Sequence, residues 1–253
     1  GRRLLRRLLR LRPLTTTSAP GRRLTTVDAV SRAAALRALG ETASVCERCR
    51  LAAGRTQVVF GSGHPDADLM FVGEAPGFHE DQQGIPFVGQ AGKLLERLLA
   101  GIGLSRQDVY IANVLKCRPP GNRNPQPDEI EACEPHLFRQ IEAIRPVLVA
   151  TLGNFATKLL SGKPHGITRV HGQEQEATVG GNRVTLLPLY HPAAALYTPA
   201  MLKVLESDFA RIPDLLARAN TPAAPAPSPL PPPSPAPPPV VAREPDAVQL
   251  GLF

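Results

Sequence analysis

Apolar and polar residues alternate along the chain in two different patterns. Residues 69–72 form a short apolar run, Leu-Met-Phe-Val, that ends at Gly73, and this pattern predicts a buried strand. Between residues 93 and 99 four leucines recur with helical spacing, while Lys93, Glu96 and Arg97 occupy the opposite face. The chain therefore passes from a strand through a polar loop into a helix that returns along the sheet.

The same two patterns predict the other elements. Strands are expected at residues 57–60, 109–114 and 147–151, and a hairpin is expected from 174–179 and 184–189 around Gly180-Gly181-Asn182. Helices are expected at residues 26–40, 127–144 and 199–217, with a short helix after residue 154. Strands that alternate with helices form a mostly parallel sheet covered on both faces, so the predicted fold class is three-layer α/β/α.

Proline divides the chain into unequal parts. Eleven of the 28 prolines lie between residues 221 and 240, a composition that excludes a helix or a central strand and is typical of a polyproline linker. We therefore expect four segments: a disordered Arg-rich leader at 1–25, one folded domain at 26–220, a disordered Pro-rich linker at 221–248 and a separate peptide at 249–253.

The net charge of +7 is concentrated at the start of the sequence. Eight arginines precede the first acidic residue, Asp28, and without them 29 − 8 = 21 basic residues face 22 acidic ones. The rest of the chain is near neutral, so a nucleic-acid surface has to be a local patch. The leader has the composition of a targeting peptide or an electrostatic arm, although a disordered leader is the simpler interpretation. No apolar run in the sequence is long enough to span a membrane.

Four cysteines suggest a second site: Cys46, Cys49, Cys117 and Cys133, of which the first two form a C-x-x-C motif. Two disulfides are one interpretation, but this motif in a long chain without a secretory leader favours a metal or redox site. Four thiolates match either a structural zinc ion or one iron–sulfur cluster, and the spacing does not distinguish the two.

Polar residues follow three predicted strands at the point where each strand ends. Glu74 and Glu80 follow one strand, Asn113 ends the next, and His191 follows the last. Each of these residues alone is more typical of a turn or a cap, but the carboxyl ends of parallel strands share one edge of a sheet, where open α/β sheets bind ligands. We therefore expect the active site at this edge, together with the apolar Phe87.

Five separated motifs accompany these residues. They are GEAPG at 73–77, ED-x-x-G-x-PFVG-x-AG-x-LL at 80–95, NVLKCRPP at 113–120, NRNP at 122–125 and HPAA at 191–194. With the four cysteines they occur in the order found in family 4 of the uracil-DNA glycosylases, and the chain resembles this family over about residues 43–210. The resemblance implies a central four-stranded, mostly parallel sheet and a [4Fe–4S] cluster held by the cysteines.

The resemblance also implies how the base is bound. Uracil has to leave the DNA stack to be reached, and Phe87 would stack on the flipped ring. Asn113 would accept a hydrogen bond from N3–H and donate one to O4, a pattern that cytosine reverses. Glu80 would border the place where the methyl group of thymine falls, and Asn122 would hold Glu80 there.

The implied reaction is hydrolysis of the N-glycosidic bond, which releases uracil and leaves an abasic site in base excision repair. His191 and the backbone amide of Ala75 would stabilise the charge that develops on uracil O2, and Glu74 would orient water or stabilise the sugar cation. The alternatives are a non-catalytic or covalently trapping binder of uracil-DNA, a Cys₄ zinc module, and a recruitment adaptor. The loop at 119–127 lacks the basic insert of the trapping branch, which favours turnover.

Further residues are expected to contact DNA or a protein partner. Lys116, Arg118 and Arg123 would face phosphates, and Leu196 would enter the duplex where the base has left. The last five residues, QLGLF, resemble the peptide that bacterial replication proteins insert into the sliding clamp, with Gln249, Leu250, Leu252 and Phe253 as the contacts. We expect a cytoplasmic, nucleoid-associated monomer that does not bind membranes.

Overall fold

The computed structural model describes residues 26–219. The predicted Arg-rich leader, the Pro-rich linker and the QLGLF peptide lie outside the described residues.

The described part of the chain is built on one six-stranded sheet in the order β1-β3-β2-β4-β6-β5. Its strands are β1 (Ser62–Gly63), β2 (Leu69–Gly73), β3 (Tyr110–Asn113), β4 (Leu148–Leu152), β5 (Gln175–Val179) and β6 (Asn182–Leu189). The four central strands are parallel to one another, whereas β1 and β5 pair antiparallel at the two edges. The predicted α/β class is confirmed. The predicted number of four strands describes only the parallel part, because a short edge strand and one arm of a hairpin extend the sheet.

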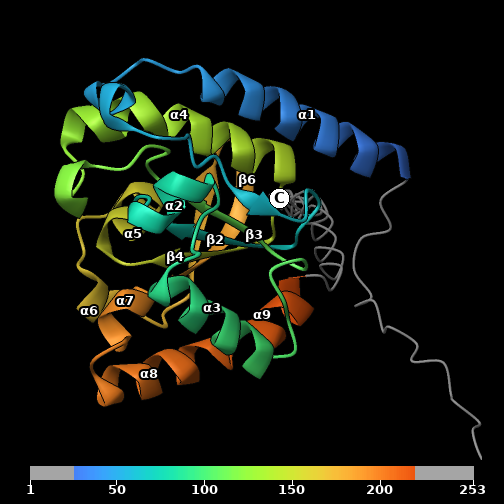
Figure 1. The fold of residues 1–253 in the computed structure, drawn as a ribbon. Helices are drawn as coiled ribbons and strands as arrows, with labels where there is room; N and C mark the ends of the chain where they lie inside the picture. Colours follow the sequence, from blue (N-terminus) through green and yellow to red (C-terminus); the bar gives the residue numbers. More distant parts are fainter. Residues whose placement is uncertain (1–25, 220–253) are drawn as a thin grey trace, which may run out of the picture. The chain divides into compact units, whose positions relative to one another are not determined.

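Helices cover both faces of this sheet (Figure 1). Alternate residues of β2 point to opposite faces, so Met70 and Val72 belong to one buried core, and Leu69 and Phe71 belong to the other. The first core packs against α1 (Thr26–Ser44), α4 (Pro127–Ile144) and α5 (Asn154–Ser161). The second packs against α3 (Gln90–Gly101), α8 (Pro199–Phe209) and α9 (Ile212–Ala219).

Short helical segments connect the larger elements at the carboxyl edge of the sheet and around it. They are η1 (Arg50–Gly54), α2 (Phe78–Gln83), η2 (Pro120–Asn122), α6 (Ile167–Val170) and α7 (Pro192–Ala195). Across residues 26–219, no helix combines the length and the apolar character that crossing a bilayer requires.

Three predicted boundaries are wrong for identifiable reasons. Helix α1 continues through Gly40 to Ser44, because the small cost of one glycine in a helix is outweighed by packing against the rest of the fold. Residues 57–60 form no strand; Val59 N–H donates one hydrogen bond to the Lys116 carbonyl, and the edge strand starts at Ser62. The last predicted helix is two helices, because Pro213 can only stand in the first turn of α9.

Candidate active site and cysteine cluster

The parallel strands bring the predicted polar residues to one edge of the sheet. Gly73 at the end of β2 pairs with Asn113 at the end of β3, so Glu74 and Asn113 lie side by side. The chain after β6 returns to the same edge, where a Cβ built on Gly153, directly after β4, would lie 3.4 Å from the Cβ of His191. The edge predicted from the sequence is therefore a single site in the fold.

Asn113 is the most unusual residue of this site. The residue is 1% exposed. Among the buried side-chain nitrogen and oxygen atoms of residues 26–219, its Oδ1 is the one without a hydrogen-bond partner. A Cβ on Gly73 would collide with Oδ1 and would lie 2.6 Å from Cζ of Phe87. The absence of a side chain at Gly73 therefore allows the Asn113 amide and the Phe87 ring to lie close to each other above the strand end. The buried Asn113 oxygen is available to a ligand.

Phe87 forms one wall of this pocket. Its ring is buried and stacks on the ring of His191, with centroids 5.5 Å apart and an angle of 29° between the planes. Its backbone has a φ of 55°, a region that a phenylalanine rarely adopts. Arg106 holds this conformation, since its Nη1 donates to the Phe87 carbonyl at 2.8 Å and its Nη2 donates to the Pro86 carbonyl at 2.6 Å. The role of Arg106 could not be predicted from the sequence, because nothing near this residue in the chain indicates a binding site.

His191 is held as a neutral hydrogen-bond donor. It precedes α7, and its Nδ1 accepts a hydrogen bond from the Ala193 N–H at 3.1 Å, which assigns the ring proton to Nε2. Burial lowers the pKa of His191 to about 4, while the charge of Glu80 acts in the opposite direction. The imidazole can therefore donate from Nε2 at neutral pH without carrying a charge.

Two carboxylates complete the pocket. Oε1 of Glu80 accepts hydrogen bonds from the N–H groups of Val88 and Gly89, both at 2.9 Å, and so fixes the loop that follows Phe87. Glu74 is half-buried, and burial raises the pKa of its carboxyl group. Ala75 follows it and packs partly against the first core.

The four cysteines gather around one cavity beside the first core. Cys46, Cys49, Cys117 and Cys133 all line it, and each is a free thiol, so the structure contains no disulfide among the described residues. Three nitrogen atoms contact their sulfurs: Lys116 N at 3.2 Å from Cys133 Sγ, His136 Nε2 at 3.3 Å from Cys46 Sγ, and Arg55 Nη1 at 3.6 Å from Cys117 Sγ. The contacts from Lys116 and Arg55 are donated by N–H groups, and such contacts are typical of the surroundings of sulfur ligands. Four soft donors around a common space fit an iron–sulfur cluster.

Comparison with known proteins decides the family. The model of the uracil DNA glycosylase superfamily matches residues 60–212. The type-4 uracil-DNA glycosylase of Saccharolobus solfataricus is 49% identical over 177 residues, which are 68% of this chain and 82% of that protein. The type-4 uracil-DNA glycosylase of Archaeoglobus fulgidus is 48% identical over 177 residues, 68% of this chain and 89% of that protein. The chain belongs to the type-4 uracil-DNA glycosylases.

Not all of the predicted DNA contacts of this type-4 glycosylase face solvent. Lys116 is 2% exposed, and its Nζ donates to the Asn113 carbonyl at 2.8 Å and to Gln140 Oε1 at 2.5 Å. The prediction that Lys116 faces a phosphate is therefore wrong, because the chain stays buried in the first core after β3 ends at Asn113, and two acceptors inside the protein bind the Lys116 ammonium group. Arg123 is partly exposed, and both of its Nη atoms pair with the buried carboxylate of Glu129 at 2.9 and 2.5 Å. The contact of Arg123 with DNA stays a prediction.

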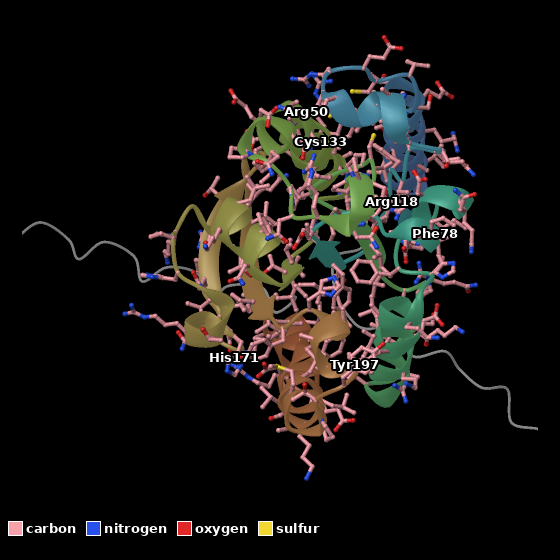
Figure 2. All side chains as sticks on the ribbon, turned by 60° about the vertical axis from the view of Figure 1, so that its left-hand side comes forward. Arg50, Phe78, Arg118, Cys133, His171 and Tyr197 are labelled. Atoms are coloured by element: carbon pink, nitrogen blue, oxygen red, sulfur yellow. The ribbon has the colours of Figure 1, made fainter. Side chains whose placement is uncertain are left out.

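The remaining predicted residues of the glycosylase lie at the rim of the site. The exposed Asn122 accepts a hydrogen bond through Oδ1 from Arg118 Nε at 2.7 Å, whereas the recorded hydrogen bonds of the Glu80 carboxylate go to the 88–89 backbone. Leu196 is half-buried and packs against the second core, while its neighbour Tyr197 is 88% exposed (Figure 2).

Proposed function

We propose that this chain excises uracil from DNA by hydrolysing the bond between uracil N1 and the sugar C1′. The family assignment supports this reaction, and the observation that carries it in this chain is the buried, unpartnered Oδ1 of Asn113. Uracil presents an N–H donor at N3 and an oxygen acceptor at O4, which match the oxygen and the NH₂ group of one amide. Cytosine presents the reverse pattern, so binding it would leave two buried polar groups unpaired.

His191 supports the departure of the base. As the bond breaks, negative charge develops on uracil O2, and a neutral Nε2–H donor stabilises this charge without prior proton uptake. The N–H of Ala75 is the proposed second donor. Phe87, stacked on His191, supplies the apolar face on which the flipped ring lies.

Glu74 is the proposed group on the sugar side. The transition state carries positive charge on the sugar, and water attacks C1′ as uracil leaves as an anion. A half-buried carboxylate with a raised pKa stabilises the cation and accepts the proton that the attacking water loses. Glu80 limits the space beside the ring through its hold on the 88–89 backbone, which is the proposed barrier to the thymine methyl group.

The test is base release from a uracil-containing oligonucleotide by the wild type, Asn113→Ala and His191→Ala. Asn182→Ala, at the start of β6 and remote from the pocket, is the matched control. We expect free uracil from the wild type and the control, and a loss of about 10²-fold or more in kcat for the two pocket variants. Absence of uracil release by the wild type, or full activity of Asn113→Ala, would contradict the proposal.

We also propose that the four cysteines hold a [4Fe–4S] cluster, whose role is to tie together the segments that precede η1, follow β3 and form α4. The shared cavity of four thiols supports this assignment. Iron and acid-labile sulfide in anaerobically purified protein, lost in Cys133→Ser, would support the cluster; zinc in place of iron would contradict it.

A further proposal concerns the sequence outside the described residues. The QLGLF sequence at 249–253 supplies one polar and three apolar contacts for a bacterial sliding clamp and would bring the monomeric enzyme to replicating DNA in the nucleoid. Deletion of residues 249–253 should abolish pull-down by the clamp and leave excision on free oligonucleotides intact. Unchanged pull-down would refute this partner.

A further inference from the structure

Phe78 is an aromatic side chain that the fold leaves in the open. It is 51% exposed at the start of α2, whereas the pocket residue Phe87 and the core residues Phe71 and Phe209 are buried. A phenyl ring exposed to water is available to a ligand, and nucleic-acid bases stack on aromatic side chains of this kind. The position of Phe78 beside the active site makes this exposure informative.

Arg118 holds the ring of Phe78 in place. Its guanidinium carbon lies 5.1 Å from the ring centroid, within the range of a cation–π interaction. Arg118 is itself oriented by the hydrogen bond from its Nε to Asn122 Oδ1. The ring of His79 also meets Phe78 edge-on, with centroids 5.5 Å apart. Phe78 and Arg118 therefore form an ordered pair with a charge beside a flat apolar surface, as Figure 2 shows.

The pair is connected to the uracil pocket through α2. Glu80, in the same helix as Phe78, binds the N–H groups of Val88 and Gly89 directly after Phe87. Gly77 lies close against this carboxylate, because a Cβ at that position would be 2.8 Å from Glu80 Oε2. The helix that presents Phe78 to solvent is thus fixed to the pocket wall by its next turn.

We propose that Phe78, supported by Arg118, is a stacking platform for the nucleobase next to the flipped uracil. This inference rests on the proposed glycosylase function and adds a second contact to it. Every base has an aromatic face, so stacking on a phenyl ring tolerates any sequence, and a neighbouring guanidinium neutralises the adjoining phosphate. A neighbouring base is free to stack on a protein ring only when it has left its own stack, so the platform favours single-stranded or locally opened DNA.

The test uses Phe78→Ala, Phe78→Leu and Phe78→Trp with Ile85→Ala as the matched control, since Ile85 is also apolar and 43% exposed and follows the same helix. Each protein is assayed on single-stranded oligonucleotides in which uracil is flanked either by normal bases or by an abasic spacer on one side. A parallel set carries the fluorescent base 2-aminopurine next to a non-hydrolysable uracil nucleotide, which reports stacking independently of base release.

We expect Phe78→Ala and Phe78→Leu to raise KM by about tenfold on the normal strand with little change in kcat. The spacer on the stacking side should raise KM of the wild type and leave the Ala variant unaffected, and Phe78→Trp should retain the wild-type KM. Quenching of 2-aminopurine should be lost only in the Ala and Leu variants. Equal KM values for the wild type and Phe78→Ala, or equal effects of the spacer on both proteins, would contradict the stacking platform. Uracil release by the wild type would still support the glycosylase function in that case.

Discussion

Lys116 and Asn113 are joined by a hydrogen bond in which the lysine Nζ donates to the asparagine carbonyl at 2.8 Å. The same Nζ donates to Gln140 on α4, and the backbone N–H of Lys116 contacts Cys133 Sγ. One buried residue therefore contacts both the end of β3, where Asn113 lies, and helix α4, which carries Cys133. The cysteine cluster and the uracil pocket share this residue and are not independent parts of the fold.

Replacing Lys116 by Met should damage both sites. The change leaves the Asn113 carbonyl and Gln140 Oε1 without a donor, and each buried unpaired acceptor costs about 1–3 kcal/mol. We expect a lower Tm and a fall of about tenfold in kcat/KM, measured by thermal unfolding and uracil release. Lys158→Met on α5, where the side chain is exposed, is the control. A fully active and stable Lys116→Met protein would show that the bond is dispensable.

Gly73→Ala should close the pocket while leaving the rest of the sheet intact. Its Cβ would lie 2.6 Å from Phe87 Cζ and would collide with Asn113 Oδ1, so one of these side chains has to move. Displacing a binding group by about 1 Å can cost about 10²-fold in rate, and we expect a loss of that size in kcat/KM for uracil excision. Gly101→Ala at the end of α3 meets nothing within 4 Å and should retain activity. Wild-type kinetics for Gly73→Ala would contradict the described pocket.

Arg106→Met should loosen the loop that carries Phe87. The variant lacks both hydrogen bonds to the carbonyls of residues 86 and 87, and the unusual backbone of Phe87 then has less support. We expect KM for uracil-DNA to rise by about tenfold and the pocket loop to exchange its amide hydrogens faster. Arg97→Met on α3 provides the comparison, and similar hydrogen exchange in both variants would argue against a role for Arg106.

His191 should make the stability of the fold depend on pH. The unfolded chain takes up a proton near the ordinary His value of 6.5, whereas the folded protein keeps the ring neutral down to about 4. Between these values the unfolded state binds more protons, so the free energy of unfolding falls as the pH is lowered through this window. Denaturant titrations at pH values near 6.5 and near 4 should show a smaller decrease in the free energy of unfolding for His191→Gln than for the wild type. A variant at His165, outside the pocket, should behave as the wild type.

The sequence was sufficient for the features that follow from local pattern. The run at Leu69–Gly73 matches β2 at both ends, because a buried strand bounded by glycine has a clear signature. The meeting of Glu74, Asn113 and His191 at one edge followed from the parallel topology alone. The hairpin turn was also predictable, since Gly180 and Gly181 both adopt positive φ.

Features that depend on distant partners were not accessible in this way. Lysine is almost always exposed, so only the approach of Gln140 and the Asn113 carbonyl explains why Lys116 is buried. The ion pair between Arg123 and Glu129 also depends on tertiary structure, because packing of α4 buries the Glu129 carboxylate. The break between α8 and α9 did have a local signal in Pro213, which was outweighed by the apolar periodicity on both sides.

The unpartnered oxygen of Asn113 lowers the stability of the fold and at the same time offers a hydrogen-bond acceptor to a ligand. Burying an acceptor without a donor lowers the stability of the free enzyme by about 1–3 kcal/mol. An apolar side chain at this position would therefore stabilise the fold, but it could not form a hydrogen bond with uracil. In the proposed binding mode, the released uracil restores the missing hydrogen bond through its N3–H. Uracil is then both the product of the reaction and a ligand that stabilises the folded enzyme. Its accumulation would inhibit the next excision and raise the free energy of unfolding, and one dissociation constant governs both effects.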